Sequence, residues 1–479
     1  MKIKSCVKDT DNHRNSIKII LIIVFTAAYY AVSFLSPFAA KNANAFYLKP
    51  VGNSHSSGRL ITLNEAYMLA ISRNDTIKAA KESYYQSSLL KWSAVGMVLP
   101  DISLKYTDQR MHENSSPIPD AYTPLMGNIF LFFFPDYQYS FDLNEPFFNV
   151  GAIPAYMAAE NTEKSSKMSL NNVSAGTLYR VAVDYYTVLN DISLIKADHK
   201  TFKEAKAHLE LTKAKLNAGL AIITDLLQAK SQFYAAKQEL ISAKNKLKSD
   251  KAALASLLGV SRHFITAKPK QPLFKKTGLR KLIVLAYNNN PGLKSLKFAQ
   301  KSASYQTAYY ESQYIPKINF SASYNALSNN HFIPEGSTNF WTAGATLTMP
   351  IFQGANRIIS IEKTRSEANQ AMYDKLQAKR NLKAQVISMY YNVKSLKSQV
   401  GTLRHEEKFA SKNFTLVEEE FKAGVATSVD VVTALAELTR ARHNLLSAKL
   451  DYYESVLDLK RLIGSFKRKL IYMKIDKLN

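Results

Sequence analysis

The chain has 479 residues, of which 46% are hydrophobic and 21% charged, and this composition excludes an intrinsically disordered chain. Only 16 glycines and 15 prolines interrupt it, which favours long continuous elements, chiefly helices. The net charge of +25 first suggests nucleic acid as a partner, with an anionic membrane surface as the alternative.

Residues 1–45 have the pattern of an export signal. Basic residues precede an apolar run from Ile19 to Val32, and Ala43-Asn44-Ala45 has the small residues of a cleavage site. An uncleaved membrane anchor is the alternative, because the apolar run is long for a signal. The only cysteine, Cys6, lies in this segment, so we expect no disulfide in the mature chain.

No other segment reaches the ~20 apolar residues of a membrane-spanning helix. A mature chain that crosses a membrane must therefore do so as a closed β-barrel. Because an exported chain meets anionic lipid headgroups, we interpret the positive charge as a solvated or lipid-facing surface and expect no nucleic-acid partner.

The rest of the chain is a duplication. Matching residues recur in one order at offsets between 204 and 216: Asn74 and Asn290, Pro100 and Pro316, Pro146 and Pro350, Gly219 and Gly424, Asp225 and Asp430. We therefore predict a signal peptide at 1–45, a first repeat at 46–264, a second repeat at 265–464 and a basic tail at 465–479.

Each repeat is predicted to begin with a helix, at 63–98 and 279–314, which a proline ends. Two strands follow, because residues 317–324 and 340–349 alternate apolar with small or polar side chains. The first copy supplies 101–107 and 137–147. Helix–strand junctions are expected at four prolines: Pro100, Pro146, Pro316 and Pro350. A small soluble sheet is the alternative to membrane strands.

A very long helix comes next in each repeat, at 152–217 and 355–422, and a shorter helix runs back after a glycine. The returning helices carry apolar residues at strict seven-residue spacing: Leu226, Phe233, Leu240, Leu247 and Leu254 in the first, Val431, Leu438, Leu445, Tyr452 and Leu459 in the second. Alanines recur three residues later. This spacing predicts antiparallel coiled coils rather than ordinary amphipathic core helices.

Four strands are too few to close a barrel, since small membrane barrels have about eight. Three copies would supply twelve. The sequence therefore predicts an α+β membrane protein, in which a trimeric 12-stranded β-barrel with four strands per chain continues into a long α-helical coiled-coil barrel.

The duplicated order of elements, from about Leu60 to Gly464, resembles the TolC family of outer-membrane efflux proteins. The most specific motif is the turn Ala218-Gly219 followed by Asp225, repeated as Ala423-Gly424 and Asp430. The resemblance implies a homotrimer in the outer membrane of a Gram-negative cell, with its helical barrel in the periplasm. It also implies a periplasmic adaptor and an inner-membrane transporter as partners.

The resemblance implies a constriction at the turns, where Gly219 and Gly424 are tip-turn glycines and Thr224, Asp225 and Asp430 are gate candidates. This sequence departs from the family's pattern in two ways. Thr433 stands where a second acidic ring is expected, and Phe421 and Ala426 replace a tyrosine and an arginine of the closing links. Helix capping alone is the competing interpretation of both aspartates.

No catalytic motif, phosphate loop or metal-ligand spacing is present in the sequence, so we expect no enzyme activity, no cofactor and no metal. The predicted function is a passive exit duct of a tripartite efflux or type I secretion system. An exported structural or adhesive coiled coil without a pore is the alternative. The sequence does not choose between small molecules and proteins as cargo.

Overall fold

The computed structural model describes residues 59–108, 137–274, 277–329 and 336–466. The predicted signal peptide and the part of the basic tail beyond Phe466 lie outside these residues. Within them, no helix is both long enough and apolar enough to cross a membrane.

The first half of the described chain contains β1 (Arg59–Ile61), α2 (Leu63–Arg73), α3 (Asp75–Gly96), β2 (Asp101–Asp108), β3 (Tyr137–Phe148), α5 (Ala152–Asn217), α6 (Ile223–Leu258) and β4 (Phe264–Thr266). The second half contains α7 (Leu279–Asn289), α8 (Pro291–Ser312), β5 (Lys317–Asn329), β6 (Gly336–Thr348), α9 (Asn356–Ala423) and α10 (Ser428–Leu462). The predicted long helices, returning helices and four strands are all confirmed. The predicted repeat boundary at residue 264 remains a prediction and falls inside β4.

The first helix of each repeat is broken in two, where we predicted one continuous helix. Asn74 and Asn290 have extended backbones, and the Oδ1 of Asn74 accepts from the backbone N–H groups of Thr76 and Ile77. Each asparagine thus begins a second helix as its N-cap, which satisfies backbone donors that would otherwise be unpaired. Pro291 then suits the first position of α8, where no N–H is needed.

The same two asparagines join the halves of each repeat. The Asn74 Nδ2 donates to the carbonyl of Leu257 at 3.1 Å, and the Asn290 Nδ2 donates to the carbonyl of Leu462 at 3.0 Å. Both acceptors lie at the C-terminal ends of returning helices, whose last carbonyls lack helical partners. The duplication therefore holds at the level of individual hydrogen bonds.

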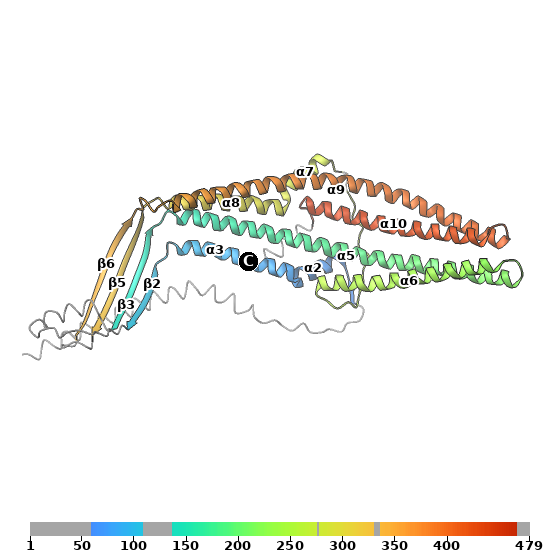
Figure 1. Ribbon diagram of the computed structural model, residues 1–479, viewed down its shortest axis with the longest axis horizontal. Helices are drawn as coiled ribbons and strands as arrows, with labels where there is room; N and C mark the ends of the chain where they lie inside the picture. Colours follow the sequence, from blue (N-terminus) through green and yellow to red (C-terminus); the bar gives the residue numbers. More distant parts are fainter. Residues whose placement is uncertain (1–58, 109–136, 275–276, 330–335, 467–479) are drawn as a thin grey trace, which may run out of the picture. The chain divides into compact units, whose positions relative to one another are not determined.

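Long helices pack side by side in two sets of four (Figure 1). Nearer the strands, α5 and α9 lie with α3 and α8, and nearer the turns they lie with α6 and α10. All ten heptad residues of α10 are buried: Val431, Ala434, Leu438, Ala441, Leu445, Ala448, Tyr452, Ser455, Leu459 and Leu462. The predicted coiled-coil seam is thereby confirmed in the second repeat.

A core cluster lies where the two sets meet, built from Tyr67 of α2, Leu178 and Tyr185 of α5, and Leu258 of α6. The short parallel pair of β1 and β4 closes over it, a pair that we did not predict. The Tyr185 hydroxyl lies 2.8 Å from the carbonyl of Ile61 and 2.6 Å from that of Ala267, so a core residue holds the pair.

The four predicted strands form one antiparallel sheet in the order β2-β3-β5-β6. The strands of the second copy are longer than predicted, because their pairing continues to Asn329 and Gly336. Pro146 lies inside β3, beside a register shift between Glu145 and Phe148, while Pro100, Pro316 and Pro350 lie just outside strands. A proline is tolerated at such a bulge, because the ladder is interrupted there and the N–H that proline lacks is not needed.

Candidate functional site

Two sharp turns connect the paired long helices at the end farthest from the sheet (Figure 1). Gly219 and Gly424 have φ angles of +73° and +82°, a left-handed conformation that glycine adopts without a Cβ penalty. The N–H of the following residue returns to the outgoing helix, from Leu220 to Lys215 and from Val425 to Glu420. The sequence-predicted turn glycines thus reverse the chain as Schellman-type caps.

Both candidate gate aspartates sit in the first turn of a returning helix. The Asp430 carboxylate accepts from the backbone N–H of Thr427 at 2.9 Å and from its hydroxyl at 2.6 Å, and the Thr427 Oγ1 accepts in return from the Asp430 N–H. This is a reciprocal capping box. These bonds, the hydroxyl first, hold the pKa of the exposed Asp430 carboxyl below its usual value.

Asp225 makes only half of that arrangement. Its carboxylate accepts from the backbone N–H of Ile222 at 3.4 Å, and an isoleucine side chain offers no acceptor in return. Thr224 is exposed beside it. Thr433, one turn after Asp430, bonds back to the carbonyl of Val429 in its own helix. All three gate candidates are therefore at the turns, and both aspartates act as helix caps within one chain.

A buried histidine links the two turns. The Ser428 hydroxyl donates to the carbonyl of Asp225 at 3.4 Å. Because its one proton is used there, Ser428 Oγ accepts from the Nε2–H of His208 at 3.1 Å. This assignment leaves Nδ1 of His208 as a buried acceptor without a partner among the described residues. Burial lowers the pKa of His208 to about 4, and the negative charge of Asp225 opposes that shift only in part.

The Phe421 side chain cannot make the hydrogen bond of the tyrosine expected at this position, but its backbone makes another contact between the helices. Its backbone carbonyl accepts from the Nζ of Lys215, which also lies 4.3 Å from the centre of the Phe421 ring. The ring is buried, and its centre lies 5.0 Å from that of His208. A cation–π contact and an apolar contact therefore hold α9 against α5 beside the turns.

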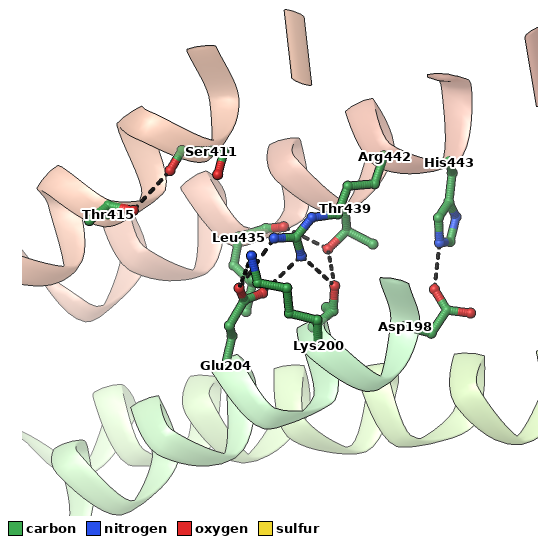
Figure 2. A network of polar contacts seen from close by, with 10 residues as sticks. Asp198, Lys200, Glu204, Ser411, Thr415, Leu435, Thr439, Arg442 and His443 are labelled. Atoms are coloured by element: carbon green, nitrogen blue, oxygen red, sulfur yellow. Dashed lines mark hydrogen bonds and ion pairs between the residues drawn. The ribbon is translucent and has the colours of Figure 1, made fainter. Parts of the chain in front are cut away.

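Farther along the same helices, α5 and α10 share a polar network, which we call the polar belt: Asp198, Thr201, Glu204, Thr439, Arg442 and His443. Figure 2 labels all of these residues except Thr201. Arg442 forms a bidentate pair with Glu204, at 2.9 and 3.2 Å, and also donates to Thr201 at 3.2 Å. His443 contacts Asp198 at 2.6 Å. The belt joins the two coiled coils, and the sequence analysis did not find it.

The sheet at the other end has two chemically different faces. Register places Leu104, Phe141, Tyr324 and Trp341 in one row and Ile102, Leu143, Ala322 and Ala343 in the next. The Leu104 and Trp341 side chains are each 75% exposed. An apolar face of this kind is unusual for a protein surface in water and matches the lipid face of a membrane strand.

The opposite face is polar. Ser103, Asp142, Ser323 and Thr342 form one of its rows, in which Ser323 and Thr342 are hydrogen-bonded at 2.8 Å. The pattern of apolar residues on one face and polar residues on the other is the one predicted from the alternating sequence. It argues against the alternative of a small soluble sheet, whose apolar face would be covered.

A family model described as outer membrane efflux protein matches residues 97–260 and 282–465, one segment in each repeat. The chain belongs to this family. Outer membrane protein TolC of Vibrio cholerae is 25% identical over 331 residues, which cover 65% of this chain and 73% of that protein. Alkaline protease secretion protein AprF of Pseudomonas aeruginosa is 22% identical over 345 residues, covering 68% and 71%.

Among solved structures, the CmeC outer membrane channel of Campylobacter jejuni aligns with a TM-score of 0.69 at 15% identity, over 87% of this chain and 88% of that one. This likeness confirms the predicted fold class. Family membership confirms the outer-membrane localisation and the predicted role as an exit duct of efflux or secretion systems. The members of this family are channel proteins.

Proposed function

We propose that three copies of this outer membrane efflux protein assemble into one duct. Their sheets form a 12-stranded barrel in the outer membrane, and their helices form a tunnel through the periplasm. A periplasmic adaptor and an inner-membrane transporter bind the helical end, and the transporter supplies the energy. The observation that carries this proposal is the two-faced sheet, whose apolar face is exposed and whose outer strands each pair on one side only among the described strands.

The edges of the sheet support assembly into a barrel. β2 and β6 each pair on one side only among the described strands. A sheet edge in lipid leaves backbone N–H and C=O groups unsatisfied at several kcal/mol each, so the strands must continue around a closed barrel. Two copies would supply eight strands, and side chains fill the interior of a barrel of that size. Three copies supply twelve and leave room for a channel.

The helical part has matching unpaired flanks. α6 and α9 are the outer helices of the set nearer the turns, since α5 and α10 pack between them. α6 exposes Leu227, Tyr234 and Ile241 at seven-residue spacing, and α9 exposes Phe409 and Leu416 at the same spacing. Contact of the α6 flank with the α9 flank of a second copy is head-to-tail, which closes into a ring.

The turns have the character of a docking surface. Leu220 and Val425 are 75% and 80% exposed, and Ile222 and Ile223 lie beside Leu220. Exposed apolar groups clustered at one end of a molecule mark a protein–protein contact. The partner that meets them is the adaptor.

The relatives do not choose between proteins and small molecules as cargo, since one is named for protease secretion and others for efflux of antibiotics or toluene.

Around the axis of a ring, Asp430 from three copies forms an acidic constriction, with Thr224 and Asp225 beside it. Such a ring attracts divalent cations, which block the current of other ions. This gate role is in addition to the capping that Asp430 provides in each copy.

Single-channel recording in planar bilayers tests both levels of the proposal. We expect a detergent-solubilised trimer with steady conductance that divalent cations block. Asp430→Asn keeps an acceptor for Thr427 but removes the charge, so block should weaken, as in Asp430→Ala. The exposed Asp374→Ala on α9 is the matched control and should behave as the wild type.

Unchanged block in Asp430→Asn would refute the gate and leave the duct intact. A protein that is monomeric and water-soluble without detergent, and forms no channels, would refute the duct itself. That second result would favour an exported structural or adhesive coiled coil.

A further inference from the structure

Three metal-binding side chains from three helices converge at one end of the polar belt. Asp198 lies on α5, Glu239 on α6 and His443 on α10, and one ligand atom of each lies within 4.8 Å of the other two. Asp198 is 2% exposed, His443 is half-buried and Glu239 is exposed. The group therefore has a buried carboxylate as its floor and an open side toward solvent.

The donor set fits a borderline divalent metal ion. One imidazole nitrogen and two carboxylate oxygens are ligands that Zn²⁺ binds, and water then completes a tetrahedral site. The two carboxylates carry charge −2, so a bound Zn²⁺ ion and a neutral imidazole leave the site neutral. Arg442 next to His443 does not neutralise Asp198, because its guanidinium is engaged by Glu204 and Thr201 (Figure 2).

The distances require a small adjustment. Two ligands of one zinc ion lie roughly 3.4 Å apart when each bond is about 2.1 Å. Asp198 and His443 are closer than this, at 2.6 Å, because a proton joins them. A metal ion would replace that proton, and the distance between the two atoms would increase by less than ~1 Å. Glu239 is exposed on the surface of α6 and can rotate toward the ion.

We propose that Asp198, Glu239 and His443 form a zinc-binding site that fastens α10 of the second coiled coil to α5 and α6 of the first. The site lies within a single chain, so it does not depend on how many copies assemble or on which cargo passes. Its occupancy restrains the two coiled coils against each other at a level between the turns and the central core. Zinc would therefore act as a stabiliser of the helical part.

Protons compete with the metal at this site. The hydrogen bond to Asp198 raises the pKa of His443, burial opposes that rise, Asp198 and Glu239 support it, and Arg442 lowers it. Because zinc binds the neutral imidazole, a proton and a zinc ion compete for the same nitrogen of His443.

Isothermal titration of the full-length, detergent-solubilised protein with zinc chloride tests the site, after treatment with a chelator and without a polyhistidine tag. We expect one zinc ion per chain and a rise in thermal stability that the chelator reverses. Glu239→Gln and His443→Gln should each weaken binding ~10-fold or more. Glu239 is exposed, so its replacement leaves the helical packing intact.

Two exposed residues on the same helices give matched controls. His199→Gln on α5, next to Asp198, and Glu437→Gln on α10 should leave zinc affinity unchanged. The absence of saturable binding up to about 1 mM zinc would overturn the proposal. So would an affinity that Glu239→Gln and His443→Gln do not change, because zinc would then be bound elsewhere on the chain.

Discussion

The Arg442–Glu204 pair predicts an asymmetric response to the loss of either partner. The Arg442 side chain is 8% exposed and that of Glu204 is 16% exposed, so both charges depend on each other for solvation. Glu204→Leu leaves the guanidinium with only the Thr201 hydroxyl, and we expect a loss of about 3–4 kcal/mol in the free energy of unfolding. Arg442→Leu should cost less, about 2 kcal/mol, because Lys200 lies 3.8 Å from Glu204 and can still pair with it.

The double replacement separates the pair from its surroundings. With both charges removed, no buried charge is left unpaired, and we expect stability within about 1 kcal/mol of the wild type. Denaturation in detergent, followed by circular dichroism, measures the midpoint and slope for each variant. Glu362→Leu, which breaks the exposed Glu362–Arg365 pair, is the control and should change stability by less than ~0.5 kcal/mol. A double variant less stable than Glu204→Leu would refute the reasoning.

Three further predictions concern the duplication, the turns and pH. Asn74→Ala and Asn290→Ala should each cost about 2 kcal/mol, as a cap and an inter-helix bond are lost; unequal losses in denaturation midpoints would break the symmetry argument. Gly464→Ala, after the end of α10, should prevent stable folding, because its Cβ would overlap the backbone carbonyl oxygen of Asn289. Gly424→Ala at the turn, where the added Cβ meets open space, should cost only about 1–2 kcal/mol, and denaturation midpoints measure both changes. The folded-state pKa of His208 is depressed to about 4, so its contribution to stability is complete above pH 6.5 and is lost as pH falls toward 4, at a cost of about 3 kcal/mol in the free energy of unfolding. The melting temperature of His208→Gln should therefore fall less across this window than that of the wild type.

Strong periodicity explains what the sequence predicted well. The long helices begin and end within about one residue of their predicted bounds, because glycines with left-handed backbones end them at known positions. The alternation of apolar and polar residues likewise predicted the four strands of the sheet. The break before α8 had a signal that we did not use, since Asn290-Pro291 combines an N-cap with a proline at the first helical position. β1 and β4 have three residues each and are too short to show a period.

The turns were predicted less completely than the helices. Their glycines and capping aspartates follow from local patterns, but the link through His208 and Ser428 does not, since 220 positions separate these residues. Lys215 was also missed, because its acceptor is the backbone of Phe421 and any residue could supply that carbonyl. Interactions that use main-chain atoms leave no mark in the sequence of the partner.

α5 explains why the polar belt and the proposed zinc site escaped sequence analysis. Its buried positions also repeat every seven residues, as Asp191, Asp198, Ala205 and Thr212, and as Thr201 and His208, but most of them are polar. A search for apolar heptads therefore finds α10 and passes over the α5 surface that packs against it. The polar seam has a physical role that an apolar one cannot fill. Leucines and alanines at seven-residue spacing pack equally well after a shift of one heptad, whereas a bidentate ion pair and a histidine–aspartate bond form in one register only. We infer that the belt sets the alignment of α10 on α5, which in turn brings both turns to the same level.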